Sequence, residues 1–354
     1  MRILITGICG FAGNALAIAL RETLEDVEVF GLDNFVRPGS ELNRLALQRI
    51  GVTVRHADLR SASDMEALPG ANWVIDAAAN PSVLAGVDGQ SSSRQVIENN
   101  LSGTVNVLEY CKARHAGLIL LSTSRVYSIP QLGSLKVEEV DGAYRPVGDQ
   151  TFPAGITLGG VAEACSTSPP VSLYGSAKLA SECLALEYGA VFDFPVWINR
   201  CGVLAGAGQF GRPDQGIFSF WINSWLRQRP LKYIGFNGRG GQVRDCLDPR
   251  DLLPLLRKQM DAETAQHRTC NVGGGAANSM SLAQLSAWCA DRFGPMEVGA
   301  DPNPRPFDIP WMVLDSARAR EDWKWKVATP IRTVLKDIAN HAESHPEWLE
   351  LSAS

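Results

Sequence analysis

The most constraining feature of this chain is its first sixteen residues, in which a short apolar run passes through three glycines into a second apolar run. Gly7, Gly10 and Gly13 follow the spacing G-x-x-G-x-x-G. Glycine lets a backbone turn tightly and approach a ligand closely, and the N-terminus of a following helix attracts negative charge. We therefore predict a buried strand at Arg2–Thr6, a glycine turn and a helix that together hold a pyrophosphate group.

Short β-branched runs alternate with amphipathic stretches through the first half of the chain. This alternation is typical of parallel βαβ units, and the strand interiors are apolar almost throughout, as in a sheet that helices cover on both faces. We predict an α/β fold with a Rossmann-type doubly wound parallel sheet and a smaller C-terminal α/β substrate domain. The predicted strands are Arg2–Thr6, Val27–Leu32, Val52–His56, Trp73–Ala77, Leu118–Ser122 and Val196–Arg200.

The second half of the chain differs in texture, because Gly, Pro and aromatic residues gather in Gly206–Gly241 around a predicted helix at Ile217–Arg227. We place a dinucleotide-binding domain at residues 1–200 and a mainly substrate-binding domain at residues 201–354. Residues 231–255 and part of the sheet edge are left open as shared between the two.

Two further segments are interpreted from their composition. Residues Val137–Pro170 are rich in Gly, Pro and Ser, which predicts a long loop before a helix at Ser176–Tyr188. The aromatic residues of Phe218–Trp225 are expected in the core or against the ligand pocket rather than on a partner surface.

Composition and charge exclude several classes of function. A formal net charge of −5 disfavours nucleic-acid binding, which needs clustered Lys and Arg. The apolar start is interrupted by glycines and followed by Arg21 and Glu22, and no other stretch reaches the length of a membrane span. Eight scattered cysteines without a C-x-x-C pair favour reduced thiols, and they do not cluster with the five histidines. We expect a cytoplasmic protein with no membrane partner, no nucleic-acid partner and no metal.

Three residues near the second and third strands bear on the kind of dinucleotide. Asp33 lies twenty positions past Gly13, where its carboxylate would bind ribose hydroxyls and repel a 2′-phosphate, so NAD is favoured over NADP. Arg37 is close enough to accommodate that phosphate and leaves NADP open. Asp58 follows the third strand and either reaches the adenine or caps a helix.

A Tyr–Lys pair points to chemistry. Tyr174 and Lys178 lie one helical turn apart on the same face, where the lysine would favour the phenolate and let the tyrosine act as a general base. Such a pair alone is a common accident. Ser122, Thr123 and Ser124 follow the fifth predicted strand, so their hydroxyls would emerge at the carboxyl edge of the sheet, where open α/β sheets bind ligands.

Taken jointly, these motifs resemble the extended short-chain dehydrogenase/reductase family, and within it the nucleotide-sugar epimerases and dehydratases. The resemblance extends from Gly7 to about Trp325. It is carried by the glycine triplet, Asp33-Asn34, Asp58-Leu59-Arg60, Asn100-Leu-Ser-Gly103-Thr104, Thr123-Ser-Arg-Val-Tyr127, Tyr174-x-x-x-Lys178, Gly240-Gly-Gln242-Val-Arg244-Asp245, Asn271-Val-Gly-Gly and Arg305-Pro-Phe-Asp308.

The resemblance also narrows the reaction. Dehydratases of the family carry Thr-Asp-Glu where this chain has Thr123-Ser124-Arg125, so dehydration is not expected. The segments Asp33–Asn43, Ala79–Val83 and Asp214-Gln215-Gly216 are similar to those of CDP-paratose 2-epimerases, as is Gln242–Asp245. Two segments depart from the family pattern where the sugar would bind: Arg200–Gly206 and the Val137–Pro170 loop.

The family's residue roles can be transferred to matching positions. The resemblance implies catalytic roles for Thr123, Tyr174 and Lys178, with Lys178 lowering the tyrosine pKa and binding the nicotinamide ribose. It implies cofactor-binding residues Gly7, Gly10, Phe11, Ala12, Gly13, Asp33, Asn34, Asp58, Leu59, Ala77, Ala78, Ala79, Asn100 and Ser122, together with Tyr174 and Lys178. It implies substrate-binding residues Ser82, Ser124, Arg125, Arg200, Gln215, Gly216, Gln242, Arg244, Arg305 and Asp308.

The expected function is therefore an NAD-dependent nucleotide-sugar epimerase that oxidises its sugar transiently to a keto-sugar and returns the hydride. A CDP-paratose 2-epimerase-like reaction is favoured, and a UDP-hexose 4-epimerase is the alternative. A non-catalytic dinucleotide-binding protein is the alternative from another class. The resemblance further implies a CDP- or UDP-sugar as the partner and a homodimer formed by the helices after Asn100 and around Tyr174–Tyr188.

Overall fold

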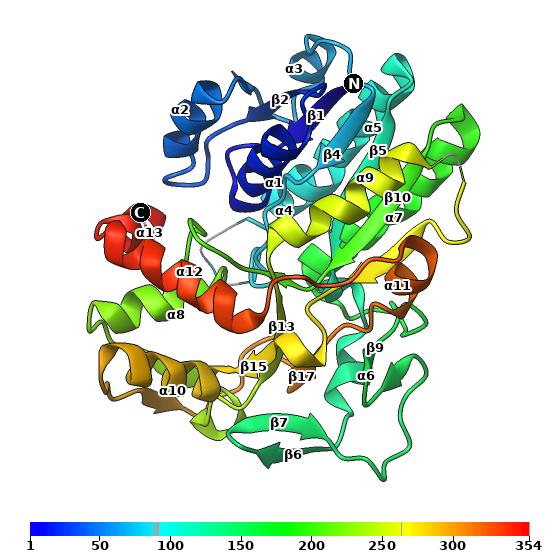
Figure 1. The fold of residues 1–354 in the computed structure, drawn as a ribbon. Coiled ribbons are helices and arrows are strands. Elements are labelled where there is room, and N and C mark those ends of the chain that lie inside the picture. Colours follow the sequence, from blue (N-terminus) through cyan, green and yellow to red (C-terminus); the bar gives the residue numbers. More distant parts are fainter. Residues whose placement is uncertain (88, 90–91, 263, 354) are drawn as a thin grey trace.

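The computed structural model describes the whole chain except residues 88, 90, 91, 263 and 354. Its centre is a seven-stranded sheet in the order β14-β10-β5-β4-β1-β2-β3, with every neighbouring pair parallel (Figure 1). The strands are β1 (Arg2–Thr6), β2 (Glu28–Asp33), β3 (Thr53–His56), β4 (Trp73–Asp76), β5 (Gly117–Thr123), β10 (Val196–Cys201) and β14 (Thr269–Val272).

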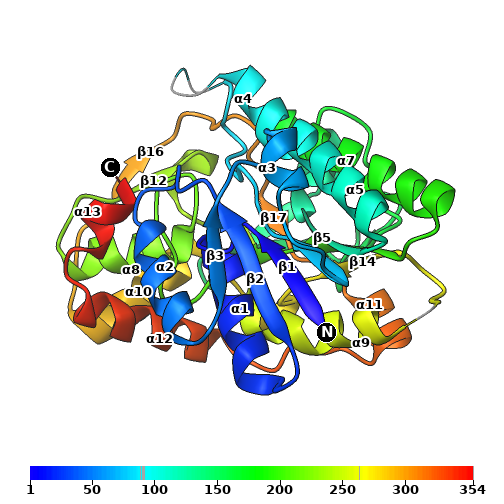
Figure 2. The ribbon, with the colours of Figure 1, turned by 90° about the horizontal axis from the view of Figure 1, so that it is seen from above.

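Helices cover both faces of this sheet, as Figure 2 shows from above. Side chains alternate along β1, so that Ile3 and Ile5 face one core and Leu4 the other. The first core is closed by α1 (Phe11–Thr23), α9 (Leu253–Asp261) and α11 (Ala317–Trp323), and α2 (Glu41–Arg49) lies at its edge. The second core is closed by α3 (Ala62–Glu66), α5 (Gly103–Arg114) and α7 (Ser172–Phe192).

The six predicted strands are confirmed to within one or two residues at their ends, and the predicted fold class is confirmed. A seventh strand, β14, was not predicted. The chain leaves the sheet after β10, builds much of the second body, and returns through α9 to place β14 beside β10. The strand order reverses between β1 and β4, and ligands of open α/β sheets bind at such a reversal.

The second body packs over the carboxyl edge of the sheet and has its own apolar core. Its strands are β11 (Val203–Leu204), β13 (Val243–Leu247), β15 (Ser279–Ser281) and β17 (Trp311–Met312) in one sheet, and β12 (Lys232–Ile234) beside β16 (Gly299–Asp301). Its helices are α8 (Ile217–Leu226), α10 (Leu282–Phe293), α12 (Ile331–Ser344) and α13 (Trp348–Ala353). Phe218, Trp221 and Trp225 are buried, which confirms the expectation for this aromatic run.

The prediction of one long loop over Val137–Pro170 was wrong. The segment folds into a hairpin of β6 (Val137–Val140) and β7 (Ala143–Pro146), followed by a smaller hairpin of β8 (Ile156–Thr157) and β9 (Gly160–Val161). Asp141 and Gly142 both have positive φ, as a two-residue hairpin turn requires. An Asp-Gly pair between short apolar runs is the sequence signal for such a turn, and it was available in the sequence.

Two short helices, α4 (Ser93–Ile97) and α6 (Ile129–Gly133), precede α7 in the chain. The helix that carries the Tyr–Lys pair, α7, is longer than the predicted Ser176–Tyr188 and begins just before Tyr174. Among the described residues, no helix has the length and apolar character needed to cross a membrane.

Candidate active site

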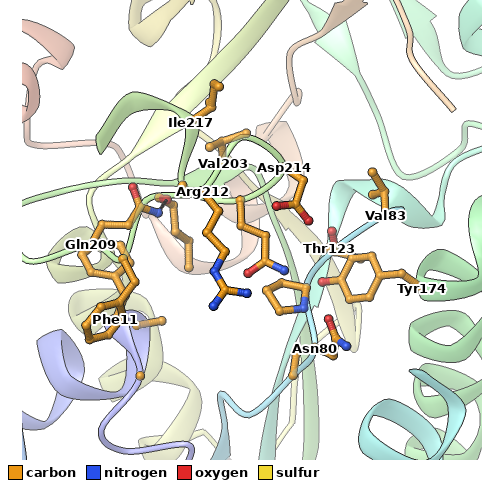
Figure 3. A pocket seen from close by; sticks show the side chains of 18 of the residues that line it. Phe11, Asn80, Val83, Thr123, Tyr174, Val203, Gln209, Arg212, Asp214 and Ile217 are labelled. Carbon is orange, nitrogen blue, oxygen red and sulfur yellow. Dashed lines mark hydrogen bonds between the residues drawn. The ribbon is translucent and has the colours of Figure 1, made fainter. Parts of the chain in front are cut away.

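A cavity of about 970 Å³ runs along the carboxyl ends of the strands, between the two bodies. Its walls come from the glycine turn, the ends of β2, β4 and β5, the start of α7 and the irregular segments of the second body. Figure 3 shows Thr123 and Tyr174 on one side of this cavity, with Phe11 and Gln209 on the opposite side. Its size is that of a ligand pocket.

The glycine turn leaves no room for larger side chains. Gly7 has a φ of +60°, and a Cβ there would lie 2.9 Å from the Cα of Ala78. Gly10 is the N-cap of α1, and no side chain caps that helix end. Gly7, Gly10, Phe11 and Ala12 line the cavity, so the helix N-terminus is open to a pyrophosphate.

Gly13 serves the same turn from behind the cavity wall. It is not among the lining residues, and a Cβ there would lie 2.4 Å from the carbonyl oxygen of Gly7. Gly13 therefore permits close packing of α1 against the turn, which corrects the prediction that it binds the cofactor directly.

Asp33 and Arg37 both line the cavity, but they differ in what they can bind. The Asp33 carboxylate accepts hydrogen bonds from the backbone N–H groups of Cys9 at 3.0 Å and Phe35 at 2.8 Å, which fixes its orientation. Burial raises the pKa of Asp33, and these backbone hydrogen bonds oppose the rise. The Arg37 guanidinium donates to Gln215 Oε1 at 2.8 Å and to the Phe210 carbonyl at 2.9 Å, so it is already occupied and does not stand ready for a 2′-phosphate.

Asp58 lines the cavity beside Asn34 and Leu59. Two hydrogen bonds from Arg60, at 2.6 and 3.0 Å, and one from Asn34, at 3.1 Å, hold its carboxylate. The hydrogen bonds with Arg60 lower the pKa of Asp58 to about 2. The helix-cap alternative was wrong, because Ser61 caps α3.

The wall between the two ends is the loop after β4, Ala77–Asn80. Thr6 Oγ1 accepts from the backbone N–H groups of Ala77 and Ala78, both at 3.1 Å. Asn100 exchanges two hydrogen bonds with the backbone of Asn80, at 2.8 and 3.1 Å, from within a π-helical turn at Glu98–Ser102. Asn100 does not line the cavity, so its predicted cofactor contact is corrected to support of the loop that does.

Thr123 and Tyr174 meet at the other end of this wall. Thr123 ends β5 and Tyr174 lies in the first turn of α7, and Figure 3 shows their side chains next to each other. Burial raises the pKa of Tyr174 to about 12, while the neighbouring Thr123 hydroxyl and the charge of Arg125 oppose the rise. The cation that favours the Tyr174 phenolate in this structure is therefore Arg125, and the expected lowering by Lys178 is not found.

Lys178 lies one turn further along α7 and is only 2% exposed. Within the described part of the chain, its ammonium has no hydrogen-bond or ion-pair partner. Burial lowers its pKa, and the nearby carboxylates of Asp76 and Glu182 oppose the change. Lys178 does not itself line the cavity, but a buried ammonium without a partner among the described residues, one turn from the lining Tyr174, fits the hydroxyls of a ribose, so the residues present fit a nicotinamide dinucleotide.

Arg200 was predicted to bind substrate, but it does not line the cavity. It is buried in an ion pair with Glu182 at 2.7 Å and donates to the Tyr127 hydroxyl at 3.3 Å. Glu182 in turn accepts from Ser122 Oγ, and none of Arg200, Glu182 and Tyr127 lines the cavity. Arg200 points to the core behind α7 because the buried Glu182 carboxylate requires a cation there.

The opposite end of the cavity gathers three arginines around one carboxylate. Arg244 forms an ion pair with Asp308 at 2.9 Å. Arg125 and Arg305 lie nearby, because the charge of Arg305 lowers the pKa of both Arg125 and Arg244. Burial, followed by the charge of Arg244, lowers the pKa of Arg125 to about 10. A site with this excess of positive charge fits a diphosphate.

Most other predicted substrate residues also line this end of the cavity. Gln242 donates to Asp308 at 2.9 Å and to the Ile234 carbonyl at 2.9 Å, and its buried Oε1 has no partner among the described residues. Ser124, Gln215 and Gly216 are lining residues as well. Ser82 is not, because its hydroxyl donates to Asp214 at 2.5 Å, which corrects the predicted substrate contact.

Several lining residues were missed by sequence reasoning. They come from the second body and share no short motif: Gln209, Phe210, Arg212, Lys232 and Met280. Asp214-Gln215-Gly216 was the nearest signal, since Gln209, Phe210 and Arg212 lie directly before it in the chain.

Comparison with known proteins identifies the family. Residues 3–273 match the model of the NAD dependent epimerase/dehydratase family. The chain belongs to this family. It is 28% identical over 301 residues to CDP-paratose 2-epimerase of Salmonella typhi, which covers 80% of this chain and 82% of that protein. It is 25% identical over 364 residues to UDP-glucuronate 4-epimerase 3 of Arabidopsis thaliana, covering 95% of this chain and 75% of that protein.

The fold has a close likeness among solved structures. UDP-glucuronic acid 4-epimerase from Bacillus cereus, in complex with UDP-glucuronic acid and NAD, superposes with a TM-score of 0.73 at 23% identity, over 97% of this chain and 99% of that one. As a member of the NAD dependent epimerase/dehydratase family, this chain is an enzyme of the extended short-chain dehydrogenase/reductase type with NAD as its cofactor.

Proposed function

We propose that this enzyme inverts one carbon of a nucleoside diphosphate sugar by transient oxidation and hydride return. The observation that carries the proposal is the adjacent pair of Thr123 and Tyr174, which line a cavity that joins the glycine turn to an arginine cluster, with the buried Lys178 one helical turn behind Tyr174. A phenol so placed serves proton transfer, and a binding module would have no use for it.

In this proposal each end of the cavity holds one ligand. The glycine turn, Asp33 and the Asp58 region bind NAD, and Lys178 binds its nicotinamide ribose. Arg244 and Arg305 hold the diphosphate of the substrate, which places the sugar between the two ends. In this proposal residues 1–200 bind NAD and residues 201–354 mainly bind the substrate, except that α9 and β14 belong to the first body.

The chain's own residues carry the proton and orient the sugar. Tyr174 takes the proton from the reacting hydroxyl, Thr123 holds that oxygen, and the positive charge of Arg125 stabilises the phenolate. Bound NAD supplies the hydride acceptor for the oxidation and the hydride donor for the return. The keto-sugar then turns over in the cavity and receives the hydride on its opposite face, while Tyr174 gives its proton back.

We favour a CDP-paratose 2-epimerase-like reaction. Two features support this choice: the similarity to CDP-paratose 2-epimerase of Salmonella typhi, and the Asp214–Gly216 segment followed by Gln242, which lines the cavity and whose buried amide oxygen has no partner among the described residues. A UDP-hexose 4-epimerase is the second candidate, supported by the similarity to UDP-glucuronate 4-epimerases. The two reactions would present different carbons to the same Tyr174.

The substrate is tested by incubating the purified enzyme with CDP-paratose in deuterated water. We expect conversion to CDP-tyvelose without solvent deuterium at C2, because the hydride returns directly. Denaturing the protein should release NAD(H). If NAD is released but CDP-paratose does not react, UDP-hexoses and UDP-hexuronates are tested next and the C2 assignment is abandoned. Deuterium at C2 would contradict hydride return itself.

We also propose a homodimer formed through α5 and α7. These helices lie together on one face of the first body, and Val191 and Phe192 at the end of α7 are exposed. Sedimentation equilibrium tests the dimer, and Val191→Glu should shift it to a monomer.

The cysteines bear on the cellular compartment. All eight are free, which supports a reducing, cytoplasmic compartment.

A further inference from the structure

The segment Gln209–Gly216, here named the latch segment, crosses the cavity between the two bodies. It begins beside the end of β11, and its side chains Gln209, Arg212 and Asp214 appear at the cavity in Figure 3. Because it lines the cavity and is fastened on both sides, its position decides how closed the site is.

Two contacts fasten the latch segment to the first body. Arg37, in the loop after β2, donates to Gln215 Oε1 at 2.8 Å and to the Phe210 carbonyl at 2.9 Å, and its guanidinium lies 5.9 Å from the centre of the Phe210 ring. Ser82, in the loop after β4, donates to Asp214 at 2.5 Å. The loop after β4 borders the reversal of strand order and the loop after β2 lies one strand further along the sheet, so the latch segment spans the region where such sheets bind their ligands.

The C-terminal helix α13 fastens the latch segment from the outside. Trp348 Nε1 donates to the Gln209 carbonyl at 3.0 Å, and the Trp348 ring stacks on Phe210 with centroids 5.1 Å apart and planes 17° apart. Arg212 Nε donates to the Ser352 carbonyl at 2.9 Å. Phe210 is thus held between Trp348 and Arg37.

The Arg37 guanidinium makes this contact at a cost. Burial and, after it, the nearby charge of Arg212 lower the pKa of Arg37 to about 10, while the charge of Asp214 opposes the change. A buried guanidinium needs hydrogen-bond partners, and those it has are both in the latch segment. The hydrogen bonds of Arg37 therefore connect the first body to the latch segment.

We propose that Arg37 is a positioning residue that holds the latch segment closed over the bound dinucleotide, with Ser82 as a second, independent fastening. Release of NAD requires both contacts to open. Closure also keeps the keto-sugar in the cavity until the hydride has returned. This second consequence rests on the proposed epimerase function, whereas retention of NAD does not.

Retention matters because the proposed reaction is balanced only over a full cycle. The sugar carbon gives a hydride to NAD and its hydroxyl gives a proton to Tyr174, and the return step restores both. A keto-sugar that escapes carries away the oxidised state and leaves reduced cofactor on the enzyme. An open latch segment would therefore cause NADH to accumulate during turnover.

The experiment compares Arg37→Met and Ser82→Ala with the unmodified protein as purified. Bound NAD is measured after gel filtration, and its dissociation rate is followed by competition with excess unlabelled NAD after loading with radiolabelled NAD. We expect dissociation roughly tenfold to a hundredfold faster in Arg37→Met, because two hydrogen bonds to a charged group are lost. Arg37→Lys should restore part of the retention, and Arg49→Met, on the exposed face of α2, is the matched control.

Hydrogen exchange separates positioning from general damage to the fold. In Arg37→Met, faster amide exchange should be confined to residues 209–216 while the melting temperature stays near that of Arg49→Met. Unchanged NAD dissociation in both Arg37→Met and Ser82→Ala would overturn the proposal. Faster dissociation without any epimerase activity in the unmodified enzyme would leave the latch intact and reject the proposed function instead.

Discussion

The two ends of the cavity are built in different ways. The dinucleotide end depends on backbone shape within a short run of sequence: Gly7 and Gly13 allow a close turn, and Asp33 is oriented by backbone N–H groups. The substrate end depends on side chains from distant segments, where Arg244, Arg305 and Arg125 meet around Asp308. A site made of backbone geometry varies little in the ligand that it accepts. One made of side chains can change its specificity by substitution.

Replacing Tyr174 removes the general base and leaves both ends of the cavity unchanged, and it has the largest expected effect. Tyr174→Phe should lower turnover by about 10²–10⁴-fold, because it removes the general base. NAD binding should persist, since the glycine turn is untouched. Single-turnover kinetics and the NAD content of the purified variant check this. A variant with normal turnover would mean that the chain is not an epimerase of this type.

Arg244→Met tests the side-chain end. It leaves the Asp308 carboxylate without its ion-pair partner in a nearly buried place, so we expect a loss of about 3 kcal/mol in the free energy of unfolding and weaker binding of the nucleotide sugar. Denaturant unfolding and calorimetric titration measure the two effects. The double variant Arg244→Met/Asp308→Asn should recover stability but not substrate affinity. Recovery of both would show that the arginine does not bind the substrate.

The pH dependence of stability reports on Asp245, a buried carboxyl on β13 behind the substrate end. Burial raises its pKa to about 6 in the folded protein, above the ordinary value of 3.8. The protonated form therefore stabilises the fold at low pH, and this contribution is lost as the pH rises from about 4 to about 6. The shift of about 2 units corresponds to about 3 kcal/mol. Asp245→Asn should flatten unfolding free energy against pH in this window, and an unaltered slope would contradict the assignment.

Gly13→Ala tests the backbone-built end. The added Cβ would lie 2.4 Å from the carbonyl of Gly7, so the turn must shift. We expect a loss of about 1–3 kcal/mol in stability together with loss of bound NAD. Gly133→Ala, where a Cβ meets nothing within 4 Å, is the control and should be neutral or slightly stabilising. If Gly13→Ala keeps its NAD, the turn is more adaptable than its contacts indicate.

Arg60→Ala should have the smallest effect. Arg60 pairs with Asp58 at the wall of the cavity, but its side chain is 40% exposed, so solvent screens the pair. We expect a loss of less than about 1 kcal/mol in the free energy of unfolding and a modest rise in the NAD dissociation constant. Isothermal titration at two salt concentrations distinguishes this effect from a larger role in binding adenine.

The sequence by itself determined the features that local geometry controls. The strand–glycine–helix start, the position of Asp33 at the end of β2, and Tyr174 and Lys178 one turn apart follow from backbone conformation and from the 3.6-residue period of a helix. The motifs also placed Thr123 at the carboxyl end of β5. Such features can be recognised because each depends on neighbours only a few residues away.

Tertiary structure alone decided which polar side chains were free to meet a ligand. Arg200 and Ser82 matched substrate positions, but Arg200 forms an ion pair with Glu182 and Ser82 donates a hydrogen bond to Asp214. Arg37 donates its hydrogen bonds to Gln215 and Phe210. Strand β14 joined the sheet only because the chain returned to it after the second body. A buried charge goes to whichever partner compensates its desolvation most fully, and that partner can lie more than a hundred residues away.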